Sequence, residues 1–414
     1  MLHTMTQKNC VRIAVVILLL WAPASHAATI TAASCSQTDV QNAVNSTASG
    51  DTVRTPGPCT SSWGSRVSLP SSKGITVDGG GNTTLTMYGF TINQNSSAST
   101  RVTGFTFTNG VPAANDYAIV VNGSPSSAAG RIDHNSFPAT TSNNTFINIS
   151  GNGPFLIDHN TFSSSGAPNE MIHNVGMGSS DASGWADNVV PGSAAMVFIE
   201  DNTFTYNPSG SPAYYYGSSA VQSYYGARTV FRHNTLNMMQ IDFHGTAGMI
   251  GARWAEVYEN TFNTGVPNAS QSNYIVIRGG SGVIFNNHHT GVNCGDNSCG
   301  NISLYEEDPP PYPATYQPGR GLNQAYSPIY IWGNDSTMPA GGDGNLVLPN
   351  RDFFVSSTQP SSMIRCEAAA DGGSSGGTTC PTTFSYTPYT YPHPLQGTGT
   401  APSAPSAPTN LTIR

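Results

Sequence analysis

The stretch Ile132-Asp133-His134-Asn135-Ser136-Phe137 recurs, with changes, along much of the chain. In each copy an apolar residue stands three positions before an asparagine, and in all but one a second apolar residue stands two positions after it. From one asparagine to the next the spacing is roughly 25 residues with two longer intervals, which is typical of a solenoid of stacked repeats. The further copies are Ile157-Asp158-His159-Asn160-Thr161-Phe162, Ile199-Glu200-Asp201-Asn202-Thr203-Phe204, Phe231-Arg232-His233-Asn234-Thr235-Leu236, Val257-Tyr258-Glu259-Asn260-Thr261-Phe262 and Ile284-Phe285-Asn286-Asn287.

Each copy predicts a strand, a sharp turn at the asparagine and a second strand, with one buried apolar side chain on either side of the turn. Asparagine suits the turn because its short amide tolerates left-handed backbone and forms local hydrogen bonds. In successive coils these amides would stack, each donating to the next. Leucine-rich, ankyrin and tetratricopeptide repeats are excluded, since the leucine spacing of the first is absent and no helix recurs in each repeat. The prediction is an all-β chain folded as a right-handed parallel β-helix.

Composition agrees with this fold class. The chain of 414 residues contains 44 Gly and 29 Pro, and 9% of its residues are charged, which favours an extended all-β solenoid over a helical globule. The regular apolar positions and 9% aromatic residues argue against disorder in the middle of the chain. The net charge of -8 gives no general affinity for nucleic acid, so we expect no nucleic-acid partner.

Residues 1–27 resemble a secretory signal peptide. Lys8 and Arg12 precede an apolar run over residues 13–22, and Ser25-His26-Ala27 supplies small residues for cleavage. The run is too short to span a membrane. We therefore expect a mature protein that is secreted to the periplasm or the cell exterior, has no membrane contact after removal of the signal, and is a monomer.

Six cysteines remain after removal of the signal. In an oxidising compartment an even number predicts disulfides, although other connectivities than the sequence-local pairs stay open. A zinc site is disfavoured, because no second Cys or His pair stands near Cys294-Gly295-Asp296-Asn297-Ser298-Cys299. The expected pairs are Cys35 with Cys59, Cys294 with Cys299, and Cys366 with Cys380.

One short helix is predicted over residues 36–45. Ser36 can cap it, and Val40, Ala43 and Val44 form an apolar face. Such a helix would cover the open end of a β-helix, whose interior is apolar. At the other end, residues 389–394 are expected to pack across the last coil, and residues 396–414 read as an Ala/Pro/Ser-rich linker and tail.

The helix after Cys35, the turn Gly50-Asp51-Thr52-Val53, the glycine turn at 79–81 and the asparagine-turn coils together resemble the pectate-lyase-like superfamily of right-handed β-helices. The resemblance covers residues 28–395, which we take as one domain. It implies the fold and leaves the reaction open, because this superfamily hosts lyases, hydrolases, epimerases, phage spikes and adhesins.

The resemblance also implies where substrate lies, on the strand that precedes the asparagine-turn strand. Here that strand is expected at 118–121, 146–149, 171–174, 220–224, 240–244 and 274–278. Alternation along these strands points one set of polar side chains outward onto a shared face. The set is His173, Gln222, Tyr224, Asp242, His244 and Arg278.

A polysaccharide lyase removes the proton α to a uronate carboxylate, so it needs a group that neutralises the carboxylate and a base near the carbon acid. We expect Arg278 or Arg253 to neutralise and His244 or Tyr224 to act as base. Many lyases of the superfamily use Ca²⁺ instead. Asp242 is the one obvious carboxylate on the face, so Ca²⁺ is a possible cofactor and the less favoured one.

Two alternatives stay open. A glycoside hydrolase needs two carboxylates that face the same sugar, for which Asp242 and Glu256 are the candidates. A non-catalytic carbohydrate-binding protein would spread aromatic residues over many coils, whereas a catalytic cleft would concentrate Arg, His and carboxylate in two or three. In every case the expected partner is a polysaccharide. The expected substrate-binding residues are His173, Gln222, Tyr215, Tyr225 and Glu256.

The repeat also supplies plain structural roles. His134, His159 and His233 share one repeat position with Asp201, Glu259 and Asn286, so we expect polar turn residues and not metal ligands. Glu200 and Arg232 share another position in consecutive coils, which predicts a structural ion pair. The net negative charge disfavours an acidic substrate unless Arg253 and Arg278 form a local positive patch.

Overall fold

The computed structural model describes most of the chain between Ala27 and Thr398. The predicted signal peptide up to residue 26, the tail from residue 399, Tyr215, and Cys294, Cys299, Cys366 and Cys380 lie outside the described residues. The described ranges are 27–94, 97–108, 117–123, 128–138, 145–151, 153–165, 170–176, 185, 189–206, 219–245, 250–263, 273–290, 301–307, 315–321, 325–343, 346–365 and 382–398.

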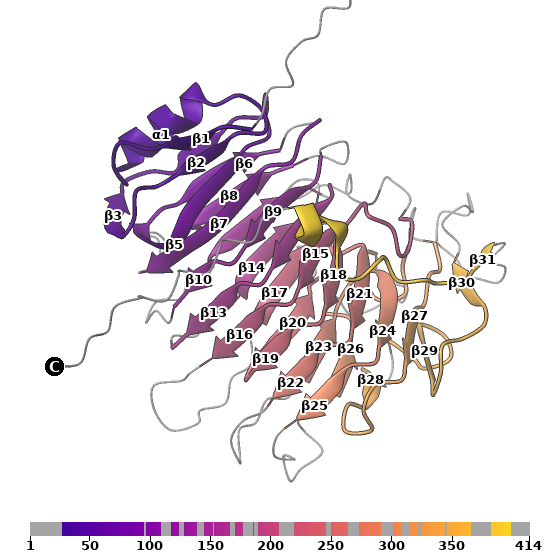
Figure 1. Cartoon of the computed structure of the whole chain (residues 1–414). Coiled ribbons are helices and arrows are strands. Elements are labelled where there is room, and N and C mark those ends of the chain that lie inside the picture. Colours follow the sequence, from indigo (N-terminus) through magenta and orange to yellow (C-terminus); the bar gives the residue numbers. More distant parts are fainter. Residues whose placement is uncertain are drawn as a thin grey trace, which may run out of the picture.

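Successive coils pair their strands in parallel, and the prediction of a right-handed parallel β-helix is confirmed (Figure 1). One sheet has ten strands: β4 (Val67–Leu69), β6 (Phe90–Asn93), β8 (Ile119–Asn122), β11 (Ile147–Ser150), β14 (Glu170–Val175), β17 (Ser219–Tyr224), β20 (Gln240–Phe243), β23 (Asn273–Ile277), β26 (Asn301–Leu304) and β28 (Ala340–Gly342).

The second sheet has 19 strands and holds the segments on both sides of the asparagine turns. They are β1 (Thr29–Thr31), β2 (Thr52–Arg54), β3 (Cys59–Trp63), β5 (Thr76–Met87), β7 (Arg101–Thr108), β9 (Gly130–Asp133), β10 (Ser136–Phe137), β12 (Phe155–Asp158), β13 (Thr161–Ser164), β15 (Val197–Glu200), β16 (Thr203–Tyr206), β18 (Arg228–Arg232), β19 (Thr235–Asn237), β21 (Trp254–Tyr258), β22 (Thr261–Asn263), β24 (Ser281–Phe285), β25 (His288–Thr290), β27 (Ile329–Trp332) and β29 (Phe353–Ser356).

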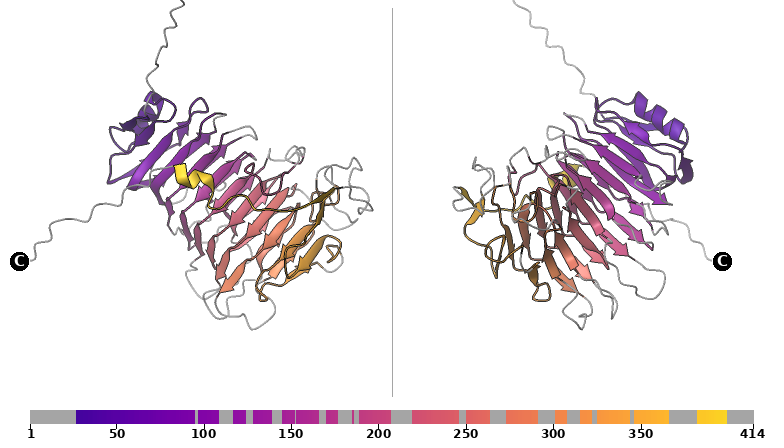
Figure 2. Two further views of the ribbon diagram at one scale, coloured as in Figure 1. Left: turned by 45° about the vertical axis from the view of Figure 1, so that its right-hand side comes forward. Right: turned by 180° about the vertical axis from the view of Figure 1, so that it is seen from behind.

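The predicted helix is α1 (Gln37–Ser46), which lies at the N-terminal end of the solenoid (Figure 2). Ser36 caps it by accepting a hydrogen bond from the backbone N–H of Asp39, 3.2 Å away. Val40, Ala43 and Val44 are buried, as expected of a helix that covers an apolar interior. Within the described residues no helix is long and apolar enough to cross a membrane.

Aromatic side chains two positions after the asparagines stack inside the solenoid. The ring centroids of Phe137 and Phe162 are 4.6 Å apart, and those of Phe162 and Phe204 are 4.8 Å apart. Both distances match the spacing of about 4.8 Å between adjacent strands. The same column continues through Leu236 and Phe262 in the register of the sheet.

The predicted stack of asparagine amides is present, and all of its members except the last, Asn334, are buried. Each Nδ2 before Asn334 donates to the Oδ1 of the asparagine in the next coil over 2.9–3.1 Å. Each Oδ1 of the later asparagines also accepts from the backbone N–H of the asparagine before it. The members are Asn135, Asn160, Asn202, Asn234, Asn260, Asn287 and Asn334.

The left-handed residue of each turn is the one before the asparagine, and the prediction that the asparagine itself is left-handed is wrong. A side chain in this conformation costs of order 1 kcal/mol, and the amide stack that follows offsets it. The asparagines of the stack themselves have negative φ. The left-handed residues are His134 (φ 52), His159 (φ 52), Asp201 (φ 57), His233 (φ 54), Glu259 (φ 55), Asn286 (φ 51) and Gly333 (φ 64).

The outer face of the strands before the turns carries buried ion pairs. Arg232 donates to Glu200 over 2.5 Å, so the predicted structural ion pair is confirmed. Arg131 likewise donates to Asp158 in the next coil, over 2.8 and 2.7 Å. Buried charges of this kind are tolerated only where partners surround them.

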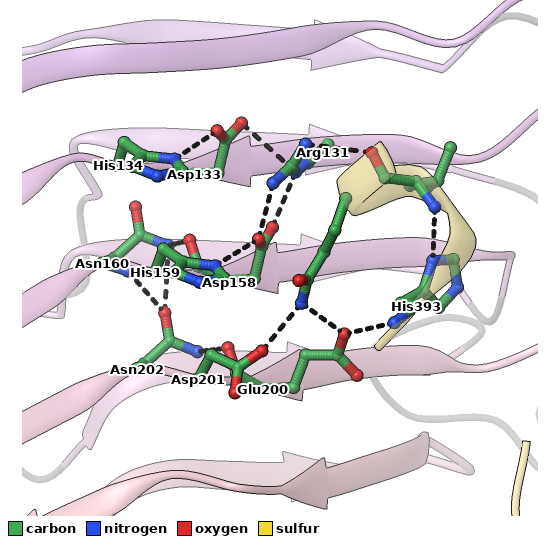
Figure 3. A network of polar contacts seen from close by, with 12 residues as sticks. Arg131, Asp133, His134, Asp158, His159, Asn160, Glu200, Asp201, Asn202 and His393 are labelled. Carbon is green, nitrogen blue, oxygen red and sulfur yellow. Dashed lines mark hydrogen bonds and ion pairs between the residues drawn. The ribbon is translucent and has the colours of Figure 1, made fainter. Parts of the chain in front are cut away.

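The partners that complete this network come from the C-terminal strap, which we define as residues 382–398. Glu200 accepts from the backbone N–H of His393 at 2.9 Å, and Arg131 donates to the carbonyl of Leu395 at 2.9 Å (Figure 3). Arg232 donates to the carbonyl of Tyr389 at 2.6 Å. The strap therefore runs back across β21, β18, β15 and β9, and the prediction that residues 389–394 pack across the last coil is wrong (Figure 1).

Cys35 and Cys59 lie beside each other next to α1. Both are free thiols in this structure, and the Cys35 thiol is hydrogen-bonded to Cys59. Burial, followed by that contact, raises the pKa of Cys35 to about 11. Their neighbourhood agrees with the predicted pairing, and the disulfide itself stays a prediction.

Replacing one member of the amide stack should destabilise the fold strongly. Asn202 donates to the carbonyls of Ile157 and Glu200 and to Asn234, and Asn202→Ala leaves these buried groups without their donor. We expect a loss of at least about 3 kcal/mol in the free energy of unfolding, measured with urea.

The matched control is Asn122→Ala, because Asn122 is exposed and its amide donates to Asn93 alone among the side-chain contacts described. A loss of about 0.5 kcal/mol or less is expected there. Equal losses of unfolding free energy in both variants would show that burial of the amide stack does not contribute to stability.

Candidate active site

The outward residues of the ten-stranded sheet form one row across adjacent coils. In the register of the sheet, His173 is the partner of Gln222, and Gln222 is the partner of Asp242. His244 and Arg278 follow directly after β20 and β23, two positions beyond the outward residues of those strands. The predicted shared face is thus the one that the structure builds.

Asp242 and Arg278 are joined by a two-point ion pair. Arg278 Nε lies 3.1 Å from Asp242 Oδ1, and Nη2 donates to Oδ2. The Asp242 side chain is 3% exposed. Burial raises the pKa of Asp242 to about 6, and Arg278 opposes this rise. The carboxylate holds one edge of the guanidinium and so directs the other edge, which carries Nη1, away from the strand.

Nη1 of Arg278 meets two residues that the sequence did not single out for this face. It donates to Glu307 Oε1, and the Tyr305 hydroxyl donates to the same oxygen over 3.4 Å. Tyr305 follows β26 at the position that corresponds to Arg278 one coil earlier, since Ser303 pairs with Val276. Extending the predicted alternation by one coil would have found Tyr305, whereas Glu307 lies past the end of β26, where no strand pattern assigns it to a face.

Tyr224 and His244 stand side by side next to this ion pair. Their ring centroids are 4.6 Å apart, and His244 Nδ1 lies 3.1 Å from Asp242 Oδ2 and also contacts Arg278. Tyr224 donates its hydroxyl hydrogen to Gln222 Oε1. Burial raises the pKa of Tyr224, with nearby Glu170 and Asp242 adding to the rise, so the phenol keeps its proton at neutral pH.

A second carboxylate–histidine pair flanks Tyr224 from the preceding coil. His173 Nδ1 lies 2.8 Å from Glu170 Oε1, and its ring stacks on Tyr224 with centroids 4.8 Å apart. Tyr224 is thus held between His173 and His244. Tyr225 lies beside Tyr224 at 6.1 Å between centroids and has left-handed backbone (φ 49). Glu170 was missed because it stands three positions before His173, an odd step that does not match strand alternation.

Arg253 and Glu256 do not belong to this face, and both predictions are corrected. Arg253 has no exposed surface, and its guanidinium lies 5.1 Å from the Trp185 ring centroid. Glu256 is in β21, a strand of the other sheet. It accepts from Trp254 Nε1 at 2.9 Å and from the Tyr386 hydroxyl at 2.7 Å, under the C-terminal strap.

Two earlier expectations depend on those positions. Asp242 and Glu256 lie in different sheets, so the carboxylate pair predicted for a hydrolase is not formed. The positive patch is likewise reduced to Arg278, since Arg253 is enclosed. Within the part of the chain that the structure describes, no three His, Cys, Asp or Glu residues are grouped to hold a metal ion.

The solved structures that are similar to this chain include two alginate lyases. No protein-family model and no curated protein sequence matches this chain. A mutant of the PL6 family alginate lyase AlyGC is similar over 83% of this chain and 56% of its own, at 12% identity and a TM-score of 0.39. An alginate lyase from Paenibacillus sp. str. FPU-7 is similar over 79% of this chain and 95% of its own, at 14% identity and a TM-score of 0.35. This chain thus spans about half the length of the first.

The raised pKa of Asp242 predicts how stability depends on pH. A carboxyl whose pKa is about 6 when folded and 3.8 otherwise binds its proton more tightly in the folded state. The stability that this proton confers is complete below about pH 4 and is lost as the pH rises through about 6. Relative to Asp242→Asn, the wild-type free energy of unfolding should fall by about 2 kcal/mol from pH 4 to pH 7 in urea titrations.

Asp133 serves as a comparison, because its pKa shifts in the opposite direction. Burial alone would raise its pKa, but hydrogen bonds from Arg101 and His134 lower it to about 2. Relative to Asp133→Asn, wild-type stability should therefore rise slightly over the same pH range, because the unfolded carboxyl still binds some protons near pH 4. A rise for Asp242 as well would mean that its ion pair with Arg278 outweighs its burial.

Proposed function

We propose that the protein is a secreted polysaccharide lyase that cleaves a uronate-containing glycan by β-elimination. One observation carries this proposal: Tyr224, His244, Asp242, Arg278 and Glu307 meet on one face, from consecutive coils of the ten-stranded sheet. A surface that only binds sugar has no need to concentrate a base, an acid and a cation in this way.

Arg278 neutralises the uronate carboxylate. Asp242 occupies Nε and Nη2 of its guanidinium, so Nη1 is the donor that is presented to a ligand. Placing positive charge at the carboxylate stabilises the carbanion-like transition state and so eases removal of the α-proton. Asp242 therefore acts as a positioning residue, because it contacts Arg278 and His244 and is itself buried.

In this proposal His244 accepts the α-proton as the general base, and Tyr224 donates a proton to the departing oxygen as the general acid. His244 Nδ1 is engaged by Asp242, so Nε2 is the nitrogen that accepts the α-proton from carbon. The electron pair of that C–H bond forms the new carbon–carbon double bond as the bond from the β-carbon to the glycosidic oxygen breaks. Tyr224, which stays protonated at neutral pH, donates its hydroxyl proton to the departing oxygen.

His173, Gln222 and Tyr225 complete the substrate-binding face in this proposal. His173 stacks on one side of Tyr224 and is held by Glu170, while Gln222 accepts the Tyr224 hydroxyl. A hydrolase is the weaker candidate, because Asp242 and Glu256 lie in different sheets and cannot face one sugar.

The first test incubates the mature protein, residues 28–414, with pectins, alginates, glycosaminoglycans and neutral glycans, with and without Ca²⁺. We expect ultraviolet absorbance of an unsaturated uronate together with new reducing ends from at least one acidic polymer, and neither from neutral glycans. Reducing ends without absorbance would instead mean hydrolysis. No signal in either assay, together with retention on a polysaccharide column, would indicate a carbohydrate-binding protein without lyase or hydrolase activity.

The roles of single residues are tested on the polymer that responds. His244→Ala and Arg278→Lys should each lower kcat/KM by about 10² to 10⁴, since one removes the base and the other the two-point guanidinium contact. His288→Ala is the control, because His288 is exposed and pairs with Asp335. Loss of activity with unchanged circular dichroism supports the roles, and a fully active variant would exclude that residue from the reaction.

A further inference from the structure

Of the two carboxylates on Arg278, only one is accessible to solvent. The Glu307 side chain is 28% exposed, whereas that of Asp242 is 3% exposed. Asp242 holds Nε and Nη2, and Glu307 binds only Nη1. Arg278 would therefore stay charge-paired and oriented by Asp242 if Glu307 left.

Glu307 also receives a second donor on the same oxygen. The Tyr305 hydroxyl lies 3.4 Å from Glu307 Oε1, the atom that Arg278 Nη1 contacts, and the Tyr305 ring centroid is 5.8 Å from Arg278 Cζ. Burial is the main cause that raises the pKa of Tyr305 to about 12, so this hydroxyl is a donor at neutral pH. A guanidinium N–H and a phenol O–H that converge on one oxygen bind carboxylates well.

We infer that Arg278 Nη1 and the Tyr305 hydroxyl form the subsite for the substrate's uronate carboxylate, and that Glu307 occupies this subsite in the free protein. The inference rests on the proposed function for its ligand. Glu307 supplies the same chemical group as the uronate: a carboxylate at the end of a side chain that solvent can reach. Substrate binding then exchanges one carboxylate for another.

This exchange explains how an acidic protein can select acidic sugars. In the free protein Glu307 pairs with Nη1 of Arg278. Other anions are therefore kept from binding weakly to this guanidinium. A neutral sugar has no carboxylate with which to replace Glu307, and it would leave Arg278 without its second partner. The subsite thus favours a uronate at the reacting position and disfavours a neutral unit there.

The competing reading makes Glu307 a positioning residue that holds Arg278 in place. The two readings predict opposite effects of Glu307→Gln, which keeps the size and removes the charge. If Glu307 is displaced by substrate, its removal strengthens binding. If Glu307 positions Arg278, its removal weakens binding and lowers kcat.

The test measures glucuronate and glucose binding to the full mature chain by titration calorimetry. We expect Glu307→Gln to bind glucuronate about five- to tenfold more tightly than the wild type, a shift of up to one decade in Kd, with glucose binding unchanged. On the responsive polymer, KM should fall by a similar factor while kcat does not fall. Adding Tyr305→Phe to Glu307→Gln should remove part of the gain, because the second donor is lost.

Glu259→Gln is the matched control for net charge. It removes the same charge from an exposed glutamate at an asparagine turn, where its partner is His233. A polyanion attracted by the altered net charge alone would bind both variants more tightly, and equal gains would overturn the inference. Weaker glucuronate binding in Glu307→Gln, or a lower kcat, would overturn it in favour of the positioning role.

Failure of the inference is separable from failure of the proposed function. Unsaturated product from a polymer, with KM and glucuronate binding unaltered in Glu307→Gln, would leave the lyase standing and refute the displacement. Tighter glucuronate binding in Glu307→Gln, with no unsaturated product from any polymer, would keep the carboxylate subsite and refute the lyase.

Discussion

The buried stack of asparagine amides fixes the register of the coils, and the rest of the structure depends on that register. Each amide joins two coils through a side-chain bond and a backbone bond, so every turn is held directly above the next. Parallel strands can slip, and a shift of one residue would exchange inward and outward side chains. With the turns held, His173, Gln222 and Asp242 fall into one row on the opposite sheet, although insertions of different length separate them in the chain. The candidate site therefore depends on amides that take no part in its chemistry.

The sequence was sufficient where the signal was local and repeated. The apolar spacing around each asparagine predicted the coils, and alternation along the preceding strand placed Tyr224, Asp242, His244 and Arg278 on one face, as observed. The same repeat showed the ion pair of Glu200 with Arg232.

Prediction failed where the chain changes direction between coils. Arg253 follows His244 by nine positions, but it precedes a strand of the other sheet and its side chain is enclosed beside Trp185. Glu307 lies past the end of β26, so no strand pattern assigns it to a face. Its contact with Arg278 crosses from one coil to the next, since β26 pairs with β23. Nearness in sequence is thus a poor guide to a shared face in a solenoid, whereas register across coils is a good one.

The C-terminal strap changes how such a molecule comes apart and together. In a simple solenoid each coil touches only its neighbours, so folding can spread along the array one repeat at a time. Here Leu395 accepts from Arg131, 264 positions earlier, and the strap supplies partners to charges in several coils between them. These buried charges gain their full set of partners only once residues 382–398 have been synthesised. The strap thus joins the coils between β9 and β21 like a clasp, so that neither end of this span can fray without breaking contacts with the strap.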